Sequence, residues 1–185
     1  MSLSTVAIAE MGDRTQLLSL MLAARYRAPW PVLCGVLCAT LANHAIAGLI
    51  GVRLGHFLSP ARLDIAVGVS MIAMALWSLK PDRLEEDPSR MSRSGAFMAT
   101  LVAFFVTEIG DKTQIATLAL AAAYSSLLAV VAGTTAGMLI ANAPVVFLGQ
   151  AFAQRLPLKA LHYGASAAFL ILGAVFIVRA AHHAA

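Results

Sequence analysis

Two heptapeptides hold most of the side chains in this chain that could do chemistry. They read Glu10-Met11-Gly12-Asp13-Arg14-Thr15-Gln16 and Glu108-Ile109-Gly110-Asp111-Lys112-Thr113-Gln114. Their carboxylate, amide and hydroxyl oxygens are hard ligands, which favour Ca²⁺, Mn²⁺ or Mg²⁺ over Zn²⁺ or Cu⁺. The motifs therefore predict a divalent-cation site with eight candidate ligands or ligand-orienting groups: Glu10, Asp13, Glu108, Asp111, Thr15, Gln16, Thr113 and Gln114.

The charge of the two motifs also matches one divalent ion. Four carboxylates contribute −4, and Arg14 and Lys112 contribute +2, which leaves −2. We predict that these two bases are counter-charges or gate residues. Because protons and metal ions compete for the same carboxylate oxygens, such a site suits exchange of a metal for protons.

The elements that carry the motifs are predicted to be membrane helices. Of the 185 residues, 60% are hydrophobic and only 12% are charged, and the mean hydropathy is +0.82. A soluble domain carries about 25% charged residues. The apolar runs predict six spanning helices, at about 2–24, 31–57, 62–79, 95–122, 127–153 and 159–180.

Both motifs fall inside the first and fourth of these predicted helices, where a carboxylate is costly and indicates function. On a continuous helix, Glu and Asp at i and i+3 share a face. The glycine between them permits either close backbone approach or a local break that frees carbonyl groups.

An internal repeat organises the chain. An offset of 98 residues superposes the two motifs without a gap and continues through Tyr26 and Tyr124, and Gly35 and Gly133. The sequence predicts a three-helix repeat at 1–79, a polar cytosolic linker at 80–94 and a second three-helix repeat at 95–185. Since three crossings end on the opposite side, the second repeat should be inverted, as in many secondary transporters.

Loop charge predicts the orientation, because lysine and arginine gather in cytoplasmic loops. With the linker inside, the cytosolic segments hold Arg25, Arg27, Lys80, Arg83, Arg90, Arg93, Arg155 and Lys159. Both termini would then be periplasmic. The basic residues form no stripe with aromatic residues, so nucleic acid is not an expected partner.

Polar residues of the second helix in each repeat are weaker candidates. The repeat offset aligns His44 with Asn142, and Asn43 lies beside His44. These side chains either line the ion path or form hydrogen bonds to neighbouring helices.

The paired E-x-G-D-(K/R)-T-Q motifs resemble the signature of the transmembrane protein 165 family, formerly uncharacterised protein family 0016. The resemblance covers nearly the whole chain, including the stretch Asn142-Ala143-Pro144. It implies exchange of Ca²⁺ or Mn²⁺ for H⁺, with manganese export across the inner membrane in bacteria. It also implies that Glu10, Asp13, Glu108 and Asp111 ligate the transported ion, which is cargo rather than a cofactor. Arg14 departs from the lysine common in the family.

The sequence is also compatible with other functions. A passive divalent-cation channel could use the same acids, and a structural membrane protein could use them in buried salt bridges. Salt bridges alone, however, would leave two carboxylates without a base. An enzyme is not expected, since the chain lacks a zinc motif such as H-E-x-x-H and a paired nucleophile and base. The residues do not rank Mn²⁺ above Ca²⁺, because both ions accept oxygen ligands.

Overall fold

The computed structural model describes residues 2–11, 13–79, 95–149 and 158–184, and this part of the chain is helical without strands. The first half contains α1, α2, α3 and α4, and the second half contains α5, α6, α7 and α9. Their bounds are Ser2–Glu10, Arg14–Tyr26, Pro29–Phe57 and Pro60–Ser78, then Ala96–Glu108, Lys112–Ala123, Leu127–Leu148 and Leu158–Ala184.

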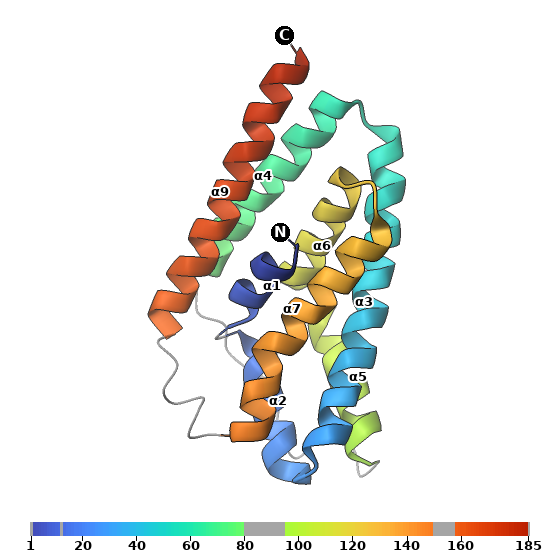
Figure 1. Ribbon diagram of the computed structural model, residues 1–185, viewed down its shortest axis with the longest axis vertical. Coiled ribbons are helices and arrows are strands. Elements are labelled where there is room, and N and C mark those ends of the chain that lie inside the picture. Colours follow the sequence, from blue (N-terminus) through green and yellow to red (C-terminus); the bar gives the residue numbers. More distant parts are fainter. Residues whose placement is uncertain (1, 12, 80–94, 150–157, 185) are drawn as a thin grey trace.

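The helices form a bundle in which the halves interleave (Figure 1). In this view α1 and α2 run downward, α3 upward and α4 downward, whereas α5 and α6 run upward, α7 downward and α9 upward. The half-helices α1 and α2 pack on α7, while α5 and α6 pack on α3. Helices α4 and α9 pack along each other on one side.

The expectation of unbroken helices at 2–24 and 95–122 is wrong. The first is divided into α1 and α2 and the second into α5 and α6, so each motif lies at helix ends and not inside a helix. Gly110 has φ of +75°, which a helix interior does not allow. Asp111 has extended backbone and caps α6. The shared helical face expected for Glu and Asp is therefore absent, and the alternative of a local break holds. Gly12 lies outside the described residues.

The other helices begin and end close to the predicted positions. Pro29 and Pro60 occupy the first turns of α3 and α4, where a missing N–H is harmless. Helix α7 ends at Leu148 and not at 153, since Gly149 follows with φ of +68°. Helix α9 continues four residues beyond the predicted 180. The predicted linker, 80–94, lies outside the described residues.

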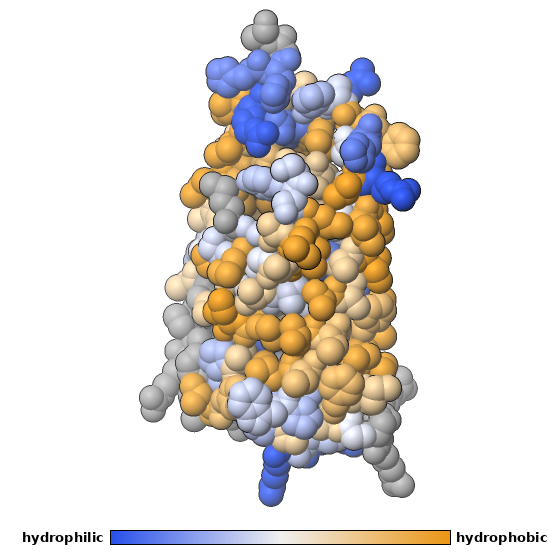
Figure 2. All heavy atoms as spheres, turned by 45° about the vertical axis from the view of Figure 1, so that its right-hand side comes forward, coloured by the Kyte–Doolittle hydropathy of each residue, from blue (hydrophilic) through white to orange (hydrophobic). Residues whose placement is uncertain are grey.

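The outer surface is suited to lipid. Four described helices are long and apolar enough to cross a membrane, namely α3, α4, α7 and the segment Tyr163–His183 of α9, and α5 is a shorter apolar helix. Figure 2 shows hydrophobic residues over the middle of one face and hydrophilic residues toward its two ends. Exposed side chains such as Leu49, Leu76 and Leu128 contribute to the apolar surface. The chain is thus an integral membrane protein.

Close helix contacts repeat between the halves. Gly35 of α3 lies against Thr100 of α5, and Gly133 of α7 lies against Ser2 of α1. The offset of 98 residues relates both members of one contact to those of the other. A Cβ at Gly35 would lie 2.9 Å from the carbonyl oxygen of Phe97, so the absence of a side chain permits this approach.

Candidate functional site

The two helix breaks face each other and exchange ion pairs. Nη2 of Arg14 lies 3.0 Å from Oδ1 of Asp111, and Nζ of Lys112 lies 2.6 Å from Oδ1 of Asp13. Each aspartate thus pairs with the base of the other motif, and the repeat offset converts one pair into the other. The Arg14 side chain is 31% exposed, but that of Lys112 is only 4% exposed. The predicted counter-charges therefore connect the two halves.

Three of the four predicted carboxylates converge. One ligand atom from each of Glu10, Asp13 and Asp111 lies within 4.8 Å of the others. Ca²⁺ binds oxygen at about 2.3–2.6 Å, so ligands on opposite sides of one ion are about 5 Å apart. All three residues are buried, and Oε1 of Glu10 has no hydrogen-bond partner among the described residues. The cluster has the dimensions of a hard-cation site.

Glu108 does not join this three-acid group, although it interacts electrostatically with Glu10. Its Oε1 lies 3.2 Å from Nε2 of His44, and its Oε2 accepts a hydrogen bond from Oγ1 of Thr40 at 3.3 Å. Both contacts come from α3. Glu108 and His44 are fully buried, at 0% exposure. The fourth predicted ligand thus has surroundings of its own.

The threonines of the motifs orient the carboxylates. Oγ1 of Thr15 donates to Oε2 of Glu10. Oγ1 of Thr113 donates to Oδ2 of Asp111 at 3.3 Å, and the backbone N–H of Thr113 also points to that oxygen, at 3.5 Å. Of the two roles expected for these hydroxyls, the structure shows that of donors to the acids.

The glutamines of the motifs form hydrogen bonds to backbone groups, one in α7 and one at the second helix break. Nε2 of Gln16 donates to the carbonyl oxygen of Ala141 in α7 at 2.8 Å. Oε1 of Gln114 accepts from the N–H of Gly110 at 2.7 Å, and its Nε2 donates to Oδ1 of Asn43 at 3.3 Å. Gln114 therefore closes the turn that separates α5 from α6.

The weaker candidates divide between two roles. Asn43 donates from Nδ2 to the carbonyl oxygen of Phe105 in α5 at 3.0 Å, so it forms an interhelical hydrogen bond. Asn142 accepts from Oγ of Ser19 in α2 at 2.6 Å, which is also an interhelical bond. Only His44 of these three lies against a motif carboxylate.

Sequence reasoning missed two site residues, Thr40 and Ser19. Thr40 precedes His44 by one helical turn, so the spacing of polar residues on α3 was a usable signal. Ser19 gave no such signal, because an isolated serine in a membrane helix is common. A further buried acid, Asp64, lies outside this site. Its Oδ2 is 3.6 Å from Nε of Arg179 and 3.5 Å from Nε2 of His183.

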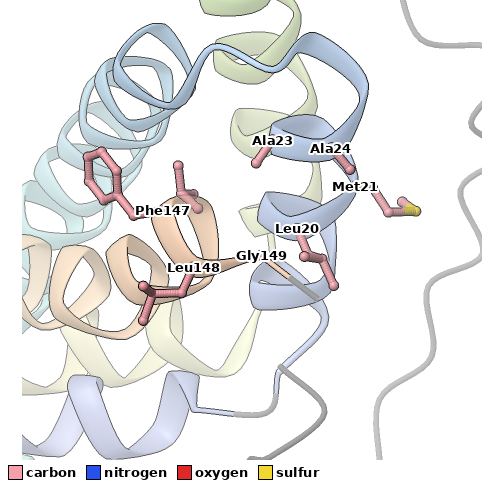
Figure 3. Close-up of a pocket in the computed structure, with 8 residues that line it drawn as sticks. Leu20, Met21, Ala23, Ala24, Phe147, Leu148 and Gly149 are labelled. Carbon is pink, nitrogen blue, oxygen red and sulfur yellow. The ribbon is translucent and has the colours of Figure 1, made fainter. Parts of the chain in front are cut away.

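A cavity of about 420 Å³ lies between α2 and α7 (Figure 3). The residues that line it have no polar side chain, and they are Leu20, Met21, Ala23, Ala24, Val146, Phe147, Leu148 and Gly149. Since no motif residue lines it and it offers no charged side chain, it is separate from the cation site.

Comparison with known proteins assigns a family. The model of the family described as "Divalent cation/proton antiporter GDT1" matches residues 1–86 and 96–184. A Vibrio cholerae serotype O1 protein named "Putative manganese exporter" is 49% identical over 172 residues, covering 92% of this chain and 86% of the relative. "Protein PAM71, chloroplastic" of Arabidopsis thaliana is 30% identical over 206 residues, covering 93% of this chain and 54% of that protein. No solved structure matches the chain.

Proposed function

We propose that this chain, which belongs to the family of divalent cation/proton antiporters GDT1, exports Mn²⁺ in exchange for H⁺ across a bacterial inner membrane. The observation that carries the proposal is the convergence of Glu10, Asp13 and Asp111 from two separate helix breaks. Oε1 of Glu10 is buried and makes no hydrogen bond among the described residues, so this oxygen can serve as a cation ligand.

The ion pairs account for the charge of the site. Asp13 and Asp111 are each paired with a base, so the surplus of two negative charges lies on Glu10 and Glu108. If the motif had only a structural role, the paired aspartates would be sufficient. The two buried glutamates would then cost free energy without any function to explain them. One divalent cation, or two protons, would neutralise both glutamates. These two alternatives are the two loaded states of an exchanger.

The architecture we propose is six membrane crossings in two inverted three-helix repeats. In this arrangement α1 with α2, and α5 with α6, each act as one broken crossing. The opposite directions of the two halves in Figure 1 support it, as do the reciprocal packing of α1 and α2 on α7 and of α5 and α6 on α3. Broken helices at a repeat interface are typical of secondary transporters.

We place both termini in the periplasm. The last turn of α2, with Arg25, and its C-cap, Arg27, lie at the end of the bundle opposite the C-terminus in Figure 1. The positive-inside rule assigns that arginine-bearing end to the cytoplasm. The site would then be reached from either side in turn, as one repeat moves against the other.

Manganese is proposed as the cargo over calcium because the Vibrio cholerae relative bears the name of a manganese exporter. Oxygen ligands alone suit either ion, so the preference must come from some further feature of the site.

The test is Mn²⁺ transport in proteoliposomes with and without an imposed pH gradient. We expect wild-type flux to follow the proton gradient, and Asp111→Asn to abolish it. The matched control is Asp64→Asn, because Asp64 is also a buried aspartate that pairs with a partly exposed arginine. Flux that ignores the pH gradient would indicate a channel. Equal effects of both substitutions would indicate a structural role for the motif.

A further inference from the structure

One buried pair, His44 with Glu108, makes a close ionic contact but no hydrogen bond between the facing atoms. Nε2 of His44 and Oε1 of Glu108 are 3.2 Å apart, yet neither atom forms a hydrogen bond among the described residues, and Nδ1 of His44 also lacks a partner. Both side chains are fully buried. An imidazole nitrogen and a carboxylate oxygen that are 3.2 Å apart can bind one cation together, so the pair offers two adjacent ligand atoms.

The surroundings hold this pair in place. Oγ1 of Thr40 binds the other oxygen of Glu108, which leaves Oε1 directed to the imidazole. Because Thr40 and His44 are one turn apart on α3, a single helix face presents both contacts. The arrangement is that of a carboxylate oxygen and an imidazole nitrogen presented together.

The other half of the molecule lacks this pair. The repeat offset places Asn142 at the position of His44 and Met138 at the position of Thr40. Asn142 is occupied by Ser19 and by the carbonyl oxygen of Met138, at 2.6 and 3.0 Å. Glu10 instead receives a hydrogen bond from Thr15 of its own motif. The imidazole therefore makes one side of the site chemically distinct.

We propose that His44 is a specificity-determining ligand, which offers its nitrogen to the transported cation beside Glu108. This inference rests on the proposed transport function and names its selectivity. Ca²⁺ and Mg²⁺ take oxygen ligands, whereas first-row transition ions accept imidazole with an affinity that increases from Mn²⁺ to Co²⁺. A single nitrogen in an otherwise oxygen-lined site thus favours Mn²⁺ over Ca²⁺.

The direct test is pulsed electron paramagnetic resonance of Mn²⁺ bound to the purified full-length protein. We expect modulation of the electron spin echo by a nitrogen nucleus, changed when the protein contains ¹⁵N-histidine and lost in His44→Asn. The control is His56→Asn, because His56 is an exposed histidine on the same helix. Bound Mn²⁺ without nitrogen modulation in the wild type would overturn the inference.

Transport measurements separate ligation from a merely structural effect. In His44→Asn, which inserts the residue of the other repeat, we expect the preference for Mn²⁺ over Ca²⁺ to fall about tenfold, a typical effect of altering groups around a metal. Apparent affinity should fall most for Co²⁺, less for Mn²⁺ and least for Ca²⁺. His44→Gln should behave like His44→Asn. Glutamine is closer to histidine in size than asparagine is, but it also lacks an imidazole nitrogen that can bind a metal ion. Equal losses for all three ions, or none, would overturn the inference.

These outcomes are distinct from failure of the proposed function. If the wild type moves Mn²⁺ with a proton gradient but His44→Asn keeps its selectivity, only the assignment of His44 fails. If the wild type neither binds nor moves any of the three ions, the proposed transport function is wrong. The assignment of His44 is then also wrong, because it rests on that function.

Discussion

The two copies of the motif are nearly identical in sequence but differ in surroundings. Both end a half-helix at glutamate and begin the next one after aspartate, and both aspartates bind the base of the opposite copy. The glutamates differ, because Glu10 lies in the three-acid group and Glu108 lies against His44. Duplication thus explains the common backbone geometry, while the residues of α3 and α7 give each half its own chemistry.

The two reciprocal ion pairs should differ most in their contribution to stability. Lys112→Met leaves Asp13 as a buried charge without this base, and loss of one partner of a buried pair typically costs about 3–5 kcal/mol. Arg14→Met also leaves a buried carboxylate, because Asp111 is 2% exposed, but it should cost less, since the hydroxyl of Thr113 still donates to Asp111. Thermal or denaturant unfolding in detergent micelles measures both.

The double variant Lys112→Met with Asp13→Asn controls for this explanation. It should recover much of the lost stability, since residue 13 is then no longer a buried charge that lacks its base. Equal destabilisation by the two single substitutions would show that the pairs are equivalent despite their different burial.

The two glutamates should differ in their contribution to transport. Glu10→Gln removes an oxygen of the three-acid group, and we expect Mn²⁺ flux to fall by about 100-fold, the upper range for altered metal surroundings. Glu108→Gln should lower flux by about tenfold and should also reduce the preference for Mn²⁺ over Ca²⁺. Initial rates in proteoliposomes measure both. A larger loss for Glu108→Gln would reverse the roles we assign to the two halves.

Much of this arrangement follows from the sequence. The repeat offset predicts which residues correspond, and the apolar runs locate α3 and α4 closely. The opposite charges of Asp13 and Lys112, and of Asp111 and Arg14, predict that the motifs attract each other. The ion pairs can be predicted from the sequence because charged residues inside a membrane protein are stable mainly when they pair with each other.

Other features depend on tertiary contacts that the sequence does not encode locally. The helix breaks were one of two possibilities allowed by glycine, and the hydrogen bond from Gly110 to Gln114 became visible only in the folded chain. The separation of Glu108 from the other acids depends on Thr40 and His44, which precede it by 68 and 64 residues. Repeat symmetry predicts equivalent surroundings for Glu10 and Glu108, and the departure from symmetry comes from α3.

The break between α5 and α6 should depend on Gly110. Gly110→Ala forces alanine to φ of +75°, which costs about 1–2 kcal/mol in the left-handed region. We expect a lower unfolding temperature and weaker transport, because Asp111 directly follows the turn. Gly95→Ala is the matched control, since φ there is −52° and a Cβ meets nothing within 4 Å. If both variants behave alike, the left-handed turn does not position the site.

The smallest effect concerns the reciprocal glycine contacts, and it tests how far the symmetry of the halves extends. Gly35→Ala places a Cβ 2.9 Å from a backbone oxygen of α5, so α3 and α5 must move apart at a cost of about 1 kcal/mol. In Gly133→Ala the nearest atom is the Ser2 hydroxyl, and the backbone N of Leu3 is 3.4 Å away. The Ser2 side chain can rotate away from the added methyl group, so we expect the free energy of unfolding to change by no more than about 0.5 kcal/mol. Unfolding of both variants in one detergent gives the comparison. Equal losses of stability in the two variants would mean that α1 is held on α7 as rigidly as α5 is on α3. The two halves would then differ only in the side chains of the site and not in helix packing.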